Sequence, residues 1–370
     1  MLLPFAVVLS TFSACTSDDD CSLNGICDTT SGRCDCDAEW SGVGCGVLNL
    51  LPTSRAAGFK PTNQSSWGGS IIRGDDGKLH MFAALMTEHC GLTSWATNSE
   101  VVHTVADTPT APFRLLNVSS DGRAVPVLRR FAHNPTIHRN RDGRYLLYHI
   151  GCSATAEPCV NCARCTNGTT CTTCGGNAKH GSGCNGPHWT GLHSSESLYG
   201  PWRDEGEVTL STPKANKWIT NPCVVPAGKG NSNSSTGANA TFLLYRQSSG
   251  SWPASSGGGE RLGWAVSMQC PSAINCTYVD ESATAPLLDV NLEDQYLWIS
   301  HRGHFHALTH KNAAGAVSGH MWSRDGHNWR MSTIPPYNNT LFFSDGSTYE
   351  CRKRARPMLI VENMVSSRLP

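Results

Sequence analysis

The sequence of 370 residues has no excess of charge of either sign, because 29 lysines and arginines balance 29 aspartates and glutamates. Its one dense basic run, Arg352–Arg356, is short and lies near the C-terminus. A protein that holds nucleic acid along its phosphates needs a broad basic surface. We therefore expect no nucleic-acid partner.

The sequence also lacks an apolar stretch long enough to cross a bilayer as a helix, which takes about 20 residues. Residues 2–14 form a short apolar run that ends in small residues, as the core of a secretory signal peptide does. We expect a signal peptide at residues 1–14, no membrane span, and a secreted, extracellular protein. An incorrectly chosen start codon is the alternative, and it predicts secretion as well.

Cysteine is abundant: the 18 cysteines are typical of an oxidising compartment, where disulfide bonds persist. Seven Asn-X-Ser/Thr acceptor patterns agree with a secretory route and, where used, make the protein a glycoprotein. The seven asparagines are Asn63, Asn117, Asn167, Asn233, Asn239, Asn275 and Asn338.

Six cysteines fall within the segment 15–45, which is too small to be held together by a hydrophobic core alone. Spacing alone does not choose among their pairings. The run CDCDAEWSGVGC resembles the end of an EGF-like domain. This resemblance implies the pairs Cys15–Cys27, Cys21–Cys34 and Cys36–Cys45. We expect an EGF-like module at residues 15–46, a spacer or adhesion unit that could contact an extracellular protein partner.

The rest of the sequence has no long stretch of helical periodicity, and short apolar runs alternate with turn signals, so the class is all-β. Strand–turn–strand units recur along it, and outer strands of a different kind lie between them. The units begin at residues 66, 132, 220, 293 and 355. Four strands in each of five units predict a five-bladed β-propeller over residues 60–370, with a β-sandwich as the alternative. The fifth unit is short, so either residues 46–60 complete it or the sequence is truncated.

The paired hairpins, the Asn-Pro starts of inner strands and the phrase SESLYGPW resemble the five-bladed propeller glycoside hydrolases of family 43 and its relatives. The resemblance covers residues 60–363 and implies hydrolysis of glycosidic bonds in an extracellular polysaccharide. It aligns the family's catalytic carboxylates with Gly69, Asn134 and Asn221, none of which can act as a base. A glycosidase with other carboxylates is therefore one hypothesis. A non-catalytic carbohydrate-binding or adhesion protein with a degenerate site is the alternative.

Three carboxylates are candidates for the catalytic groups that glycoside hydrolysis needs. Glu293 and Asp294 open the innermost strand of the fourth unit, and either could be the base; Glu88, or a histidine, could be the acid. A strand-start ion pair or hydrogen-bonded brace is the alternative for Glu293 and Asp294. The expected substrate contacts are Trp67, His89, His133, Asn134, Asn221 and His306.

No pattern calls for a cofactor. His304 and His306 are spaced to bind a metal, but a structural role is expected for each, and a central-channel calcium, as in some relatives, has no support in the sequence. Asp18–Asp20 lie after the first cysteine, whereas a calcium-binding EGF domain carries its acidic ligands ahead of it, so a solvated acidic loop is expected.

The remaining cysteines predict a second disulfide-rich region. Residues 152–187 hold seven cysteines, which we interpret as a disulfide-tied insertion in the second blade rather than a zinc site. Because seven is odd, one of them should pair with Cys90 or Cys223. Cys270 and Cys276 are expected to close their own loop.

Overall fold

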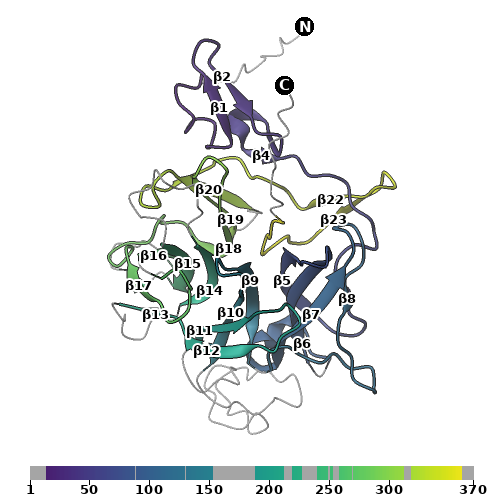
Figure 1. Cartoon of the computed structure of the whole chain (residues 1–370). Helices are drawn as coiled ribbons and strands as arrows, with labels where there is room; N and C mark the ends of the chain where they lie inside the picture. Colours follow the sequence, from purple (N-terminus) through teal and green to yellow (C-terminus); the bar gives the residue numbers. More distant parts are fainter. Residues whose placement is uncertain are drawn as a thin grey trace.

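The computed structural model describes residues 14–87, 89–129, 131–152, 188–211, 219–226, 240–248, 251–252, 258–268, 270–311 and 318–360 (Figure 1). The expected signal peptide, most of the cysteine-rich insertion and most of the loop at 228–240 lie outside these residues. Within them, no helix is long and apolar enough to cross a membrane.

The described chain is all-β, and strands form four large sheets in chain order. The first has the order β5-β6-β7-β8, with bounds Ser66–Arg73, Leu79–Met86, Ser99–Ala106 and Arg114–Leu115. The second has the order β9-β10-β11-β12, with bounds His133–Arg139, Tyr145–Cys152, His188–Ser195 and Arg203–Glu207.

The third and fourth sheets repeat this arrangement. The third has the order β14-β15-β16-β17-β13, with bounds Thr220–Pro226, Thr241–Ser248, Glu260–Ser267, Thr277–Asp280 and Thr209–Leu210. The fourth has the order β18-β19-β20-β21, with bounds Leu292–Ile299, Phe305–Lys311, Gly319–Ser323 and Arg330–Met331. The sheets are antiparallel meanders, apart from the short parallel pairing of β13 with β17.

The sheets stand around a centre, with their first strands innermost (Figure 1). β9 contacts both β5 and β14, and β14 contacts β18, so the innermost strands follow one another in chain order. Buried aromatic residues fill the space between neighbouring sheets. Trp264 of the third sheet, for example, lies edge-on to Phe305 of the fourth at a ring distance of 5.3 Å. The packing is propeller-like, because each sheet packs face to face on the next one around the centre.

After the fourth sheet the chain forms a two-stranded sheet of β22 (Thr340–Phe342) and β23 (Thr348–Glu350). Thr53, from the segment before β5, pairs in parallel with Phe343 at the turn end of this hairpin. The strand expected from residue 355 onward is not formed over 355–360.

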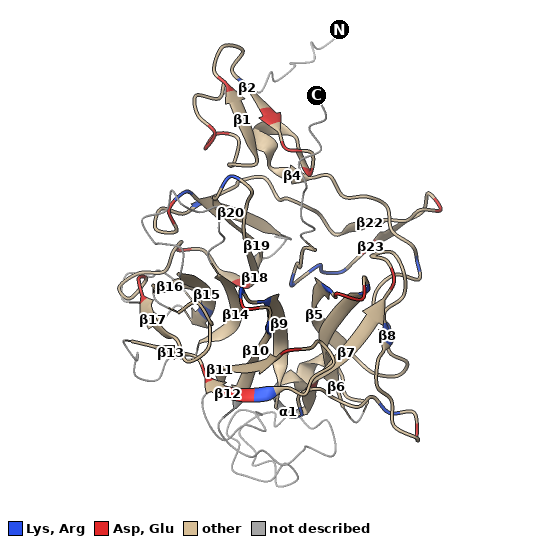
Figure 2. Ribbon diagram, in the orientation of Figure 1, with Lys and Arg blue, Asp and Glu red and all other residues tan. Residues whose placement is uncertain are grey.

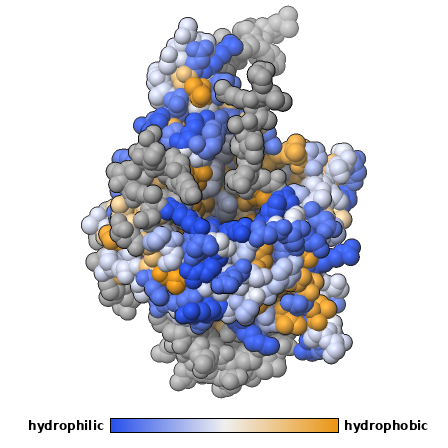
Figure 3. Space-filling model, in the orientation of Figure 1, coloured by the Kyte–Doolittle hydropathy of each residue, from blue (hydrophilic) through white to orange (hydrophobic). Residues whose placement is uncertain are grey.

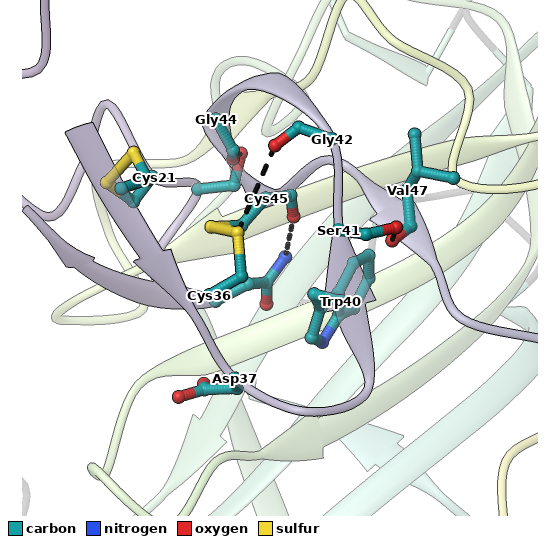
Figure 4. The surroundings of a disulfide bond; sticks show 12 residues. Cys21, Cys36, Asp37, Trp40, Ser41, Gly42, Gly44, Cys45 and Val47 are labelled. Carbon is teal, nitrogen blue, oxygen red and sulfur yellow. Dashed lines mark hydrogen bonds between the residues drawn. A yellow bond between two sulfur atoms is a disulfide. The ribbon is translucent and has the colours of Figure 1, made fainter.

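The N-terminal region is a disulfide-rich unit that contains β1 (Gly25–Asp28), β2 (Arg33–Cys36), β3 (Trp40–Ser41) and β4 (Val47–Leu48). Its disulfides are Cys15–Cys27, Cys21–Cys34 and Cys36–Cys45, the same pairs that the resemblance implied. Figure 4 shows the surroundings of one disulfide bond, with Trp40 near Cys36 and Cys45. The bonds replace the hydrophobic core that so short a segment cannot build.

The N-terminal region is held against the fourth sheet. Arg302 donates two hydrogen bonds of 2.7 Å to the Asp37 carboxylate and one of 2.6 Å to the Leu23 carbonyl. The Trp40 ring lies 4.7 Å from that of His320 on β20. A bidentate arginine–carboxylate pair with an aromatic contact beside it fixes both position and orientation.

The acidic loop is less free than expected. Asp18 accepts a hydrogen bond of 2.8 Å from the Cys27 backbone, and Asp20 accepts one of 2.8 Å from the Thr16 backbone. Asp19 forms an ion pair of 3.0 Å with Arg324 of the fourth sheet. These carboxylates therefore stabilise the turn and the contact with the fourth sheet rather than being fully solvated.

Candidate functional site

Each of the four innermost strands begins with the same backbone irregularity. A shift in pairing register follows the first residue or two of each strand, as in a β-bulge. The residue that opens each irregularity has a positive φ: 50° at Gly68, 50° at Asn134, 49° at Asn221 and 54° at Asp294. Arg356 has a φ of 50° as well. Bulges aim side chains away from the ladder, and here they aim them toward the shared centre.

The repeated backbone corrects the alignment of the first sheet. Gly68, rather than Gly69, has the positive φ that Asn134 and Asn221 share. Gly69 instead faces Met81, whose sulfur would lie 2.3 Å from an added Cβ. The two neighbouring glycines gave no way to choose between these registers from sequence. Neither of them carries a carboxylate.

Asp294 is the centre of a buried polar cluster. Its Oδ1 accepts hydrogen bonds from the Asn221 amide at 3.0 Å and from the Asn134 amide at 3.5 Å. The Asn134 amide also donates to the Asn221 Oδ1 at 2.8 Å. His310 on β19 lies 3.4 Å from the Asp294 Oδ2. Three sheets therefore meet on one carboxylate, which matches the bracing role that was the alternative for this residue.

Arg356 supplies the positive charge of this cluster. Its Nη1 lies 3.3 Å from the Asp294 Oδ1, and its Nη2 donates to the Pro135 carbonyl at 3.2 Å. The side chain is almost fully buried. A Cβ added at Gly68 would lie 2.1 Å from the Arg356 Cδ. The arginine thus fills the space that a side chain at position 68 would need.

The groups around Asp294 shift the pKa of its carboxyl. Burial alone would raise its pKa, but the His310 hydrogen bond and the charge of Arg356 bring the net pKa below the usual range. Burial lowers the pKa of Arg356, and the Asp294 charge partly offsets this effect. Glu293, Asp294 and His310 are close enough to share a cation. Arg356 already provides a positive charge there, so the cluster is balanced by a side chain.

A cavity of about 240 Å³ opens at the starts of the innermost strands. One part of its wall is apolar and contains Trp67, Leu92, Trp95 and Ile150. The other part is polar and contains His133, Asn134, Thr220, Asn221, Arg246, Glu293 and Asp294. Hydrophilic residues gather across the centre of the molecule in Figure 3, and Figure 2 shows acidic and basic residues meeting near the start of β18.

Glu293 is the accessible carboxylate of this wall, with 23% of its side chain exposed. Arg246 approaches its Oε2 at 3.8 Å and forms a closer ion pair of 2.6 Å with Glu260. His310, which faces Glu293 across the β18–β19 pair, has its Nε2 3.8 Å from the Glu293 Oε1. Because these contacts are long, neighbouring side chains hold the Glu293 carboxylate only loosely.

The expected site residues divide into three groups. Trp67, His133, Asn134 and Asn221 line the cavity beside Glu293 and Asp294. His89 does not line it: this exposed residue has its Nδ1 2.9 Å from the Asn63 carbonyl. Glu88, one of the candidates for the acid, lies outside the described residues.

His306 lies away from the cavity, contrary to expectation. It faces Trp298, five residues beyond Glu293 along β18, and each residue advances a strand by about 3.3 Å. Its ring stacks on Trp298 at 5.2 Å and on His320 at 5.4 Å. Burial holds the pKa of His306 well below its usual value, so the neutral ring belongs to the contact with the N-terminal region.

Sequence reasoning missed Arg246, Leu92, Thr220, Ile150 and the role of Arg356. For Arg356 a signal existed: Arg356-Pro357 repeats the pattern of Asn134-Pro135 and Asn221-Pro222.

The structure also bears on the expected cysteine pairs. Cys90 forms a disulfide, Cys223 is a buried free thiol, and Cys270 is bonded to Cys276. Of the two cysteines that were expected to pair with the insertion, Cys223 is excluded because it is a free thiol. Cys90 is therefore the one that can bond to the insertion.

Replacing Gly68 with alanine is expected to destabilise the protein more than the same change at Gly77. Both glycines have a positive φ, which costs an alanine about 1–2 kcal/mol. Nothing lies within 4 Å of a Cβ at Gly77, whereas Arg356 occupies the space at Gly68. Chemical denaturation of both variants measures the difference. Equal losses of stability in the two variants would show that the Arg356 side chain moves aside for a methyl group at position 68 without cost.

The fold is similar to that of solved glycoside hydrolase structures. Zg3597, a family 117 glycoside hydrolase from the marine bacterium Zobellia galactanivorans, superposes with a TM-score of 0.50 and 13% identity, covering 81% of this chain and 79% of that chain. A thermostable family-43 glycoside hydrolase gives a TM-score of 0.42 and 12% identity, over 74% of this chain and 76% of that one. At 13% identity, the likeness to the family 117 enzyme shows the fold alone.

Among curated proteins, disintegrin and metalloproteinase domain-containing protein 11 of Homo sapiens is 32% identical over 87 residues. This match covers 23% of the present chain and spans only 11% of that protein's length. No family profile matches the sequence.

Proposed function

We propose that this chain is a secreted carbohydrate-active protein whose central cavity binds a sugar and hydrolyses its glycosidic bond. The observation that carries the proposal is the cavity itself, whose lining combines two tryptophans with Glu293, Arg246 and side-chain amides. Sugars present an apolar C–H face together with a rim of hydroxyls. A cavity with one aromatic wall and one polar wall complements both.

In the proposed reaction, Glu293 is the base. It takes a proton from water, the water oxygen adds to the anomeric carbon, and the bond to the leaving oxygen breaks. His133, on the same cavity wall, is the acid that protonates the leaving oxygen. The proton on Glu293 then returns through solvent to His133. Asp294 does not react, because its oxygens are engaged by Asn134, Asn221, Arg356 and His310.

The second candidate function is binding without hydrolysis. It is favoured by Gly68, Asn134 and Asn221, which stand at three equivalent strand starts and carry no carboxylate. The single carboxylate at such a position, Asp294, is fully braced by neighbours. A site of this kind keeps the shape and the hydrogen-bonding groups that hold a sugar. It lacks the usual pair of carboxylates.

The proposal includes the organisation of the chain. A fifth blade would consist of β22, β23, the segment around Thr53 and residues 355–360. Its support is that Arg356 shares the positive φ of the other strand starts, and that Leu359 packs with the fourth sheet and Ile360 with the first. The remaining parts are a signal peptide at 1–14, an EGF-like module at 15–46 and a disulfide-tied insertion at 152–187. The EGF-like module would be the contact for an extracellular protein partner.

A screen separates the two functions. The protein recovered from a eukaryotic culture medium would be applied to a glycan array and incubated with a panel of plant, algal and matrix polysaccharides. Release of reducing ends supports the glycosidase. Array binding without release of reducing ends supports the binding protein. If folded protein neither binds the array nor releases reducing ends, both proposed functions are contradicted.

Replacing Trp95 with alanine is expected to weaken sugar binding about tenfold, because loss of one stacking ring costs about 1 kcal/mol or slightly more. Trp95 lies on the short helix α1 (Trp95–Asn98) in the cavity wall. Tyr349→Ala is the matched control, since Tyr349 is exposed on β23 and does not line the cavity. Titration calorimetry with a sugar found on the array measures both. Equal affinities would remove Trp95 from the binding wall.

A further inference from the structure

We propose that Ser99 positions His133 by holding one ring proton on Nδ1, so that Nε2 is the nitrogen that exchanges a proton at the cavity. The inference rests on the proposed function and deepens it. It assigns a role to a serine of the first sheet that lies outside the cavity wall. It also selects one of the two neutral forms of a histidine on that wall.

Ser99 is the first residue of β7 and is completely buried. Its hydroxyl donates a hydrogen bond of 2.9 Å to the Ala132 carbonyl. Its oxygen lies 2.8 Å from the Nδ1 of His133. A carbonyl can only accept, and a hydroxyl has one proton to give. The short contact with His133 therefore requires Nδ1–H to donate to the Ser99 oxygen.

The surroundings of His133 hold the ring in this orientation. His133 opens β9 directly before Asn134, and it lines the cavity although only 4% of it is exposed. The Trp95 ring lies 5.2 Å from its ring at an angle of 34°. A ring flip would exchange Nδ1 for a carbon at Ser99 and break the bond. Ser99 on one side and Trp95 over the ring thus favour a single orientation.

Charged groups of both signs lie around the cavity beside His133. His133 and the Asp294 carboxylate attract each other, which is one of the influences that lower the pKa of Asp294. The other charged groups around the cavity are Glu293, Arg246, Arg356 and Glu260, with His310 between the two carboxylates.

The chemical consequence is a directed proton transfer. In the charged ring, Nδ1–H donates to Ser99 while Nε2–H gives its proton to the leaving oxygen as the glycosidic bond breaks. The ring is then neutral with its proton still on Nδ1, so no tautomer change is needed before the next cycle. Ser99 touches no substrate and acts through His133, which makes it a positioning residue.

Nitrogen NMR of histidine-labelled protein tests the inference directly, because ring nitrogen shifts report which nitrogen carries the proton. His133→Gln assigns the signal. The expected result is the Nδ1–H form in the wild type and a mixture of both forms in Ser99→Ala. An Nε2–H form in the wild type, or an unchanged preference in Ser99→Ala, would overturn the inference. Should Ser99→Ala fail to fold, the wild-type form alone decides.

Two further variants separate positioning from a general effect on the fold. Ser99→Thr keeps the hydroxyl and is expected to keep the Nδ1–H form. Ser318→Ala removes another buried serine that donates to a backbone carbonyl, that of Tyr337, and is expected to leave His133 unchanged. A change in the His133 form in Ser318→Ala would contradict a specific role for Ser99.

On a substrate from the screen, Ser99→Ala is expected to lower kcat about tenfold with KM nearly unchanged, and Ser99→Thr to restore it. An unchanged kcat with an altered tautomer would limit Ser99 to a structural role and overturn this inference. If the wild type hydrolyses nothing, the proposed glycosidase fails. The NMR result then still decides whether Ser99 positions the ring.

Discussion

Replacing Arg356 with methionine is expected to lower the free energy of unfolding by about 3–5 kcal/mol, the usual cost of leaving a buried charge without its partner. The variant keeps most of the volume of the side chain beside Gly68. It removes the cation 3.3 Å from the Asp294 carboxylate and the hydrogen bond to the Pro135 carbonyl. Asp294 would then remain buried among Asn134, Asn221 and His310 with no fixed positive charge.

The loss of stability in Arg356→Met should depend on pH. The folded pKa of Asp294 lies below its unfolded value, so its ionised form stabilises the wild type above the unfolded pKa, and this contribution is lost as pH falls through the folded pKa. Without Arg356, burial dominates and raises the pKa of Asp294. The variant can then bury a protonated carboxyl in acid, so its deficit relative to the wild type should shrink as pH falls toward 4.

Chemical denaturation at several pH values measures this effect. Arg352→Met is the matched control, because Arg352 is exposed, and it should change stability little. Adding Asp294→Asn to Arg356→Met removes both charges and should recover part of the loss. If the double variant were less stable than Arg356→Met alone, the ion pair would not be the source of the effect.

Glu293→Gln is expected to reduce hydrolysis by about 10²–10⁴-fold, the range for loss of a general acid or base. Glutamine has the same shape but cannot take a proton from water. Stability should change little, because the Glu293 contacts with Arg246 and His310 are both 3.8 Å long and Arg246 keeps its closer partner Glu260. The effect should therefore fall on kcat rather than on folding.

Reducing-end release from the polysaccharide found in the screen, measured beside thermal unfolding, checks this expectation. Glu281→Gln serves as the control, since Glu281 is exposed and pairs with His327 away from the cavity. Asp294→Asn offers a contrast, because its expected effect is on stability. Hydrolysis that persists in Glu293→Gln would remove Glu293 from the reaction and leave the base unassigned.

Some features of the site could be predicted because their signals are local. Asn134 and Asn221 each precede a proline at the start of an apolar strand, and Glu293 and Asp294 occupy the same place in the next unit. Strand starts of this kind converge in a propeller, so the four residues were expected in one place, and all four line the cavity. Such a pattern needs only the order of strands and turns along the chain.

Other features could not be predicted, because strand alternation does not tell how far along a strand the site lies. His306 and His310 are on the same strand and are four residues apart. His310 faces Glu293, whereas His306 faces Trp298 and belongs to the contact with the N-terminal region. Register between strands decided this difference, and register depends on partners distant in sequence.

The sequence by itself determined that cysteine pairs would replace a core in the N-terminal region, that the rest would be all-β, and that small polar residues would stand at the strand starts. Disulfide loops, hairpins and turn residues are short-range, so composition and spacing suffice for them. Tertiary structure alone decided that Arg356 would meet Asp294 across 62 residues of chain, in the space left at Gly68. A buried charge selects its partner by proximity in space, and only the arrangement of the sheets around a shared centre creates that proximity.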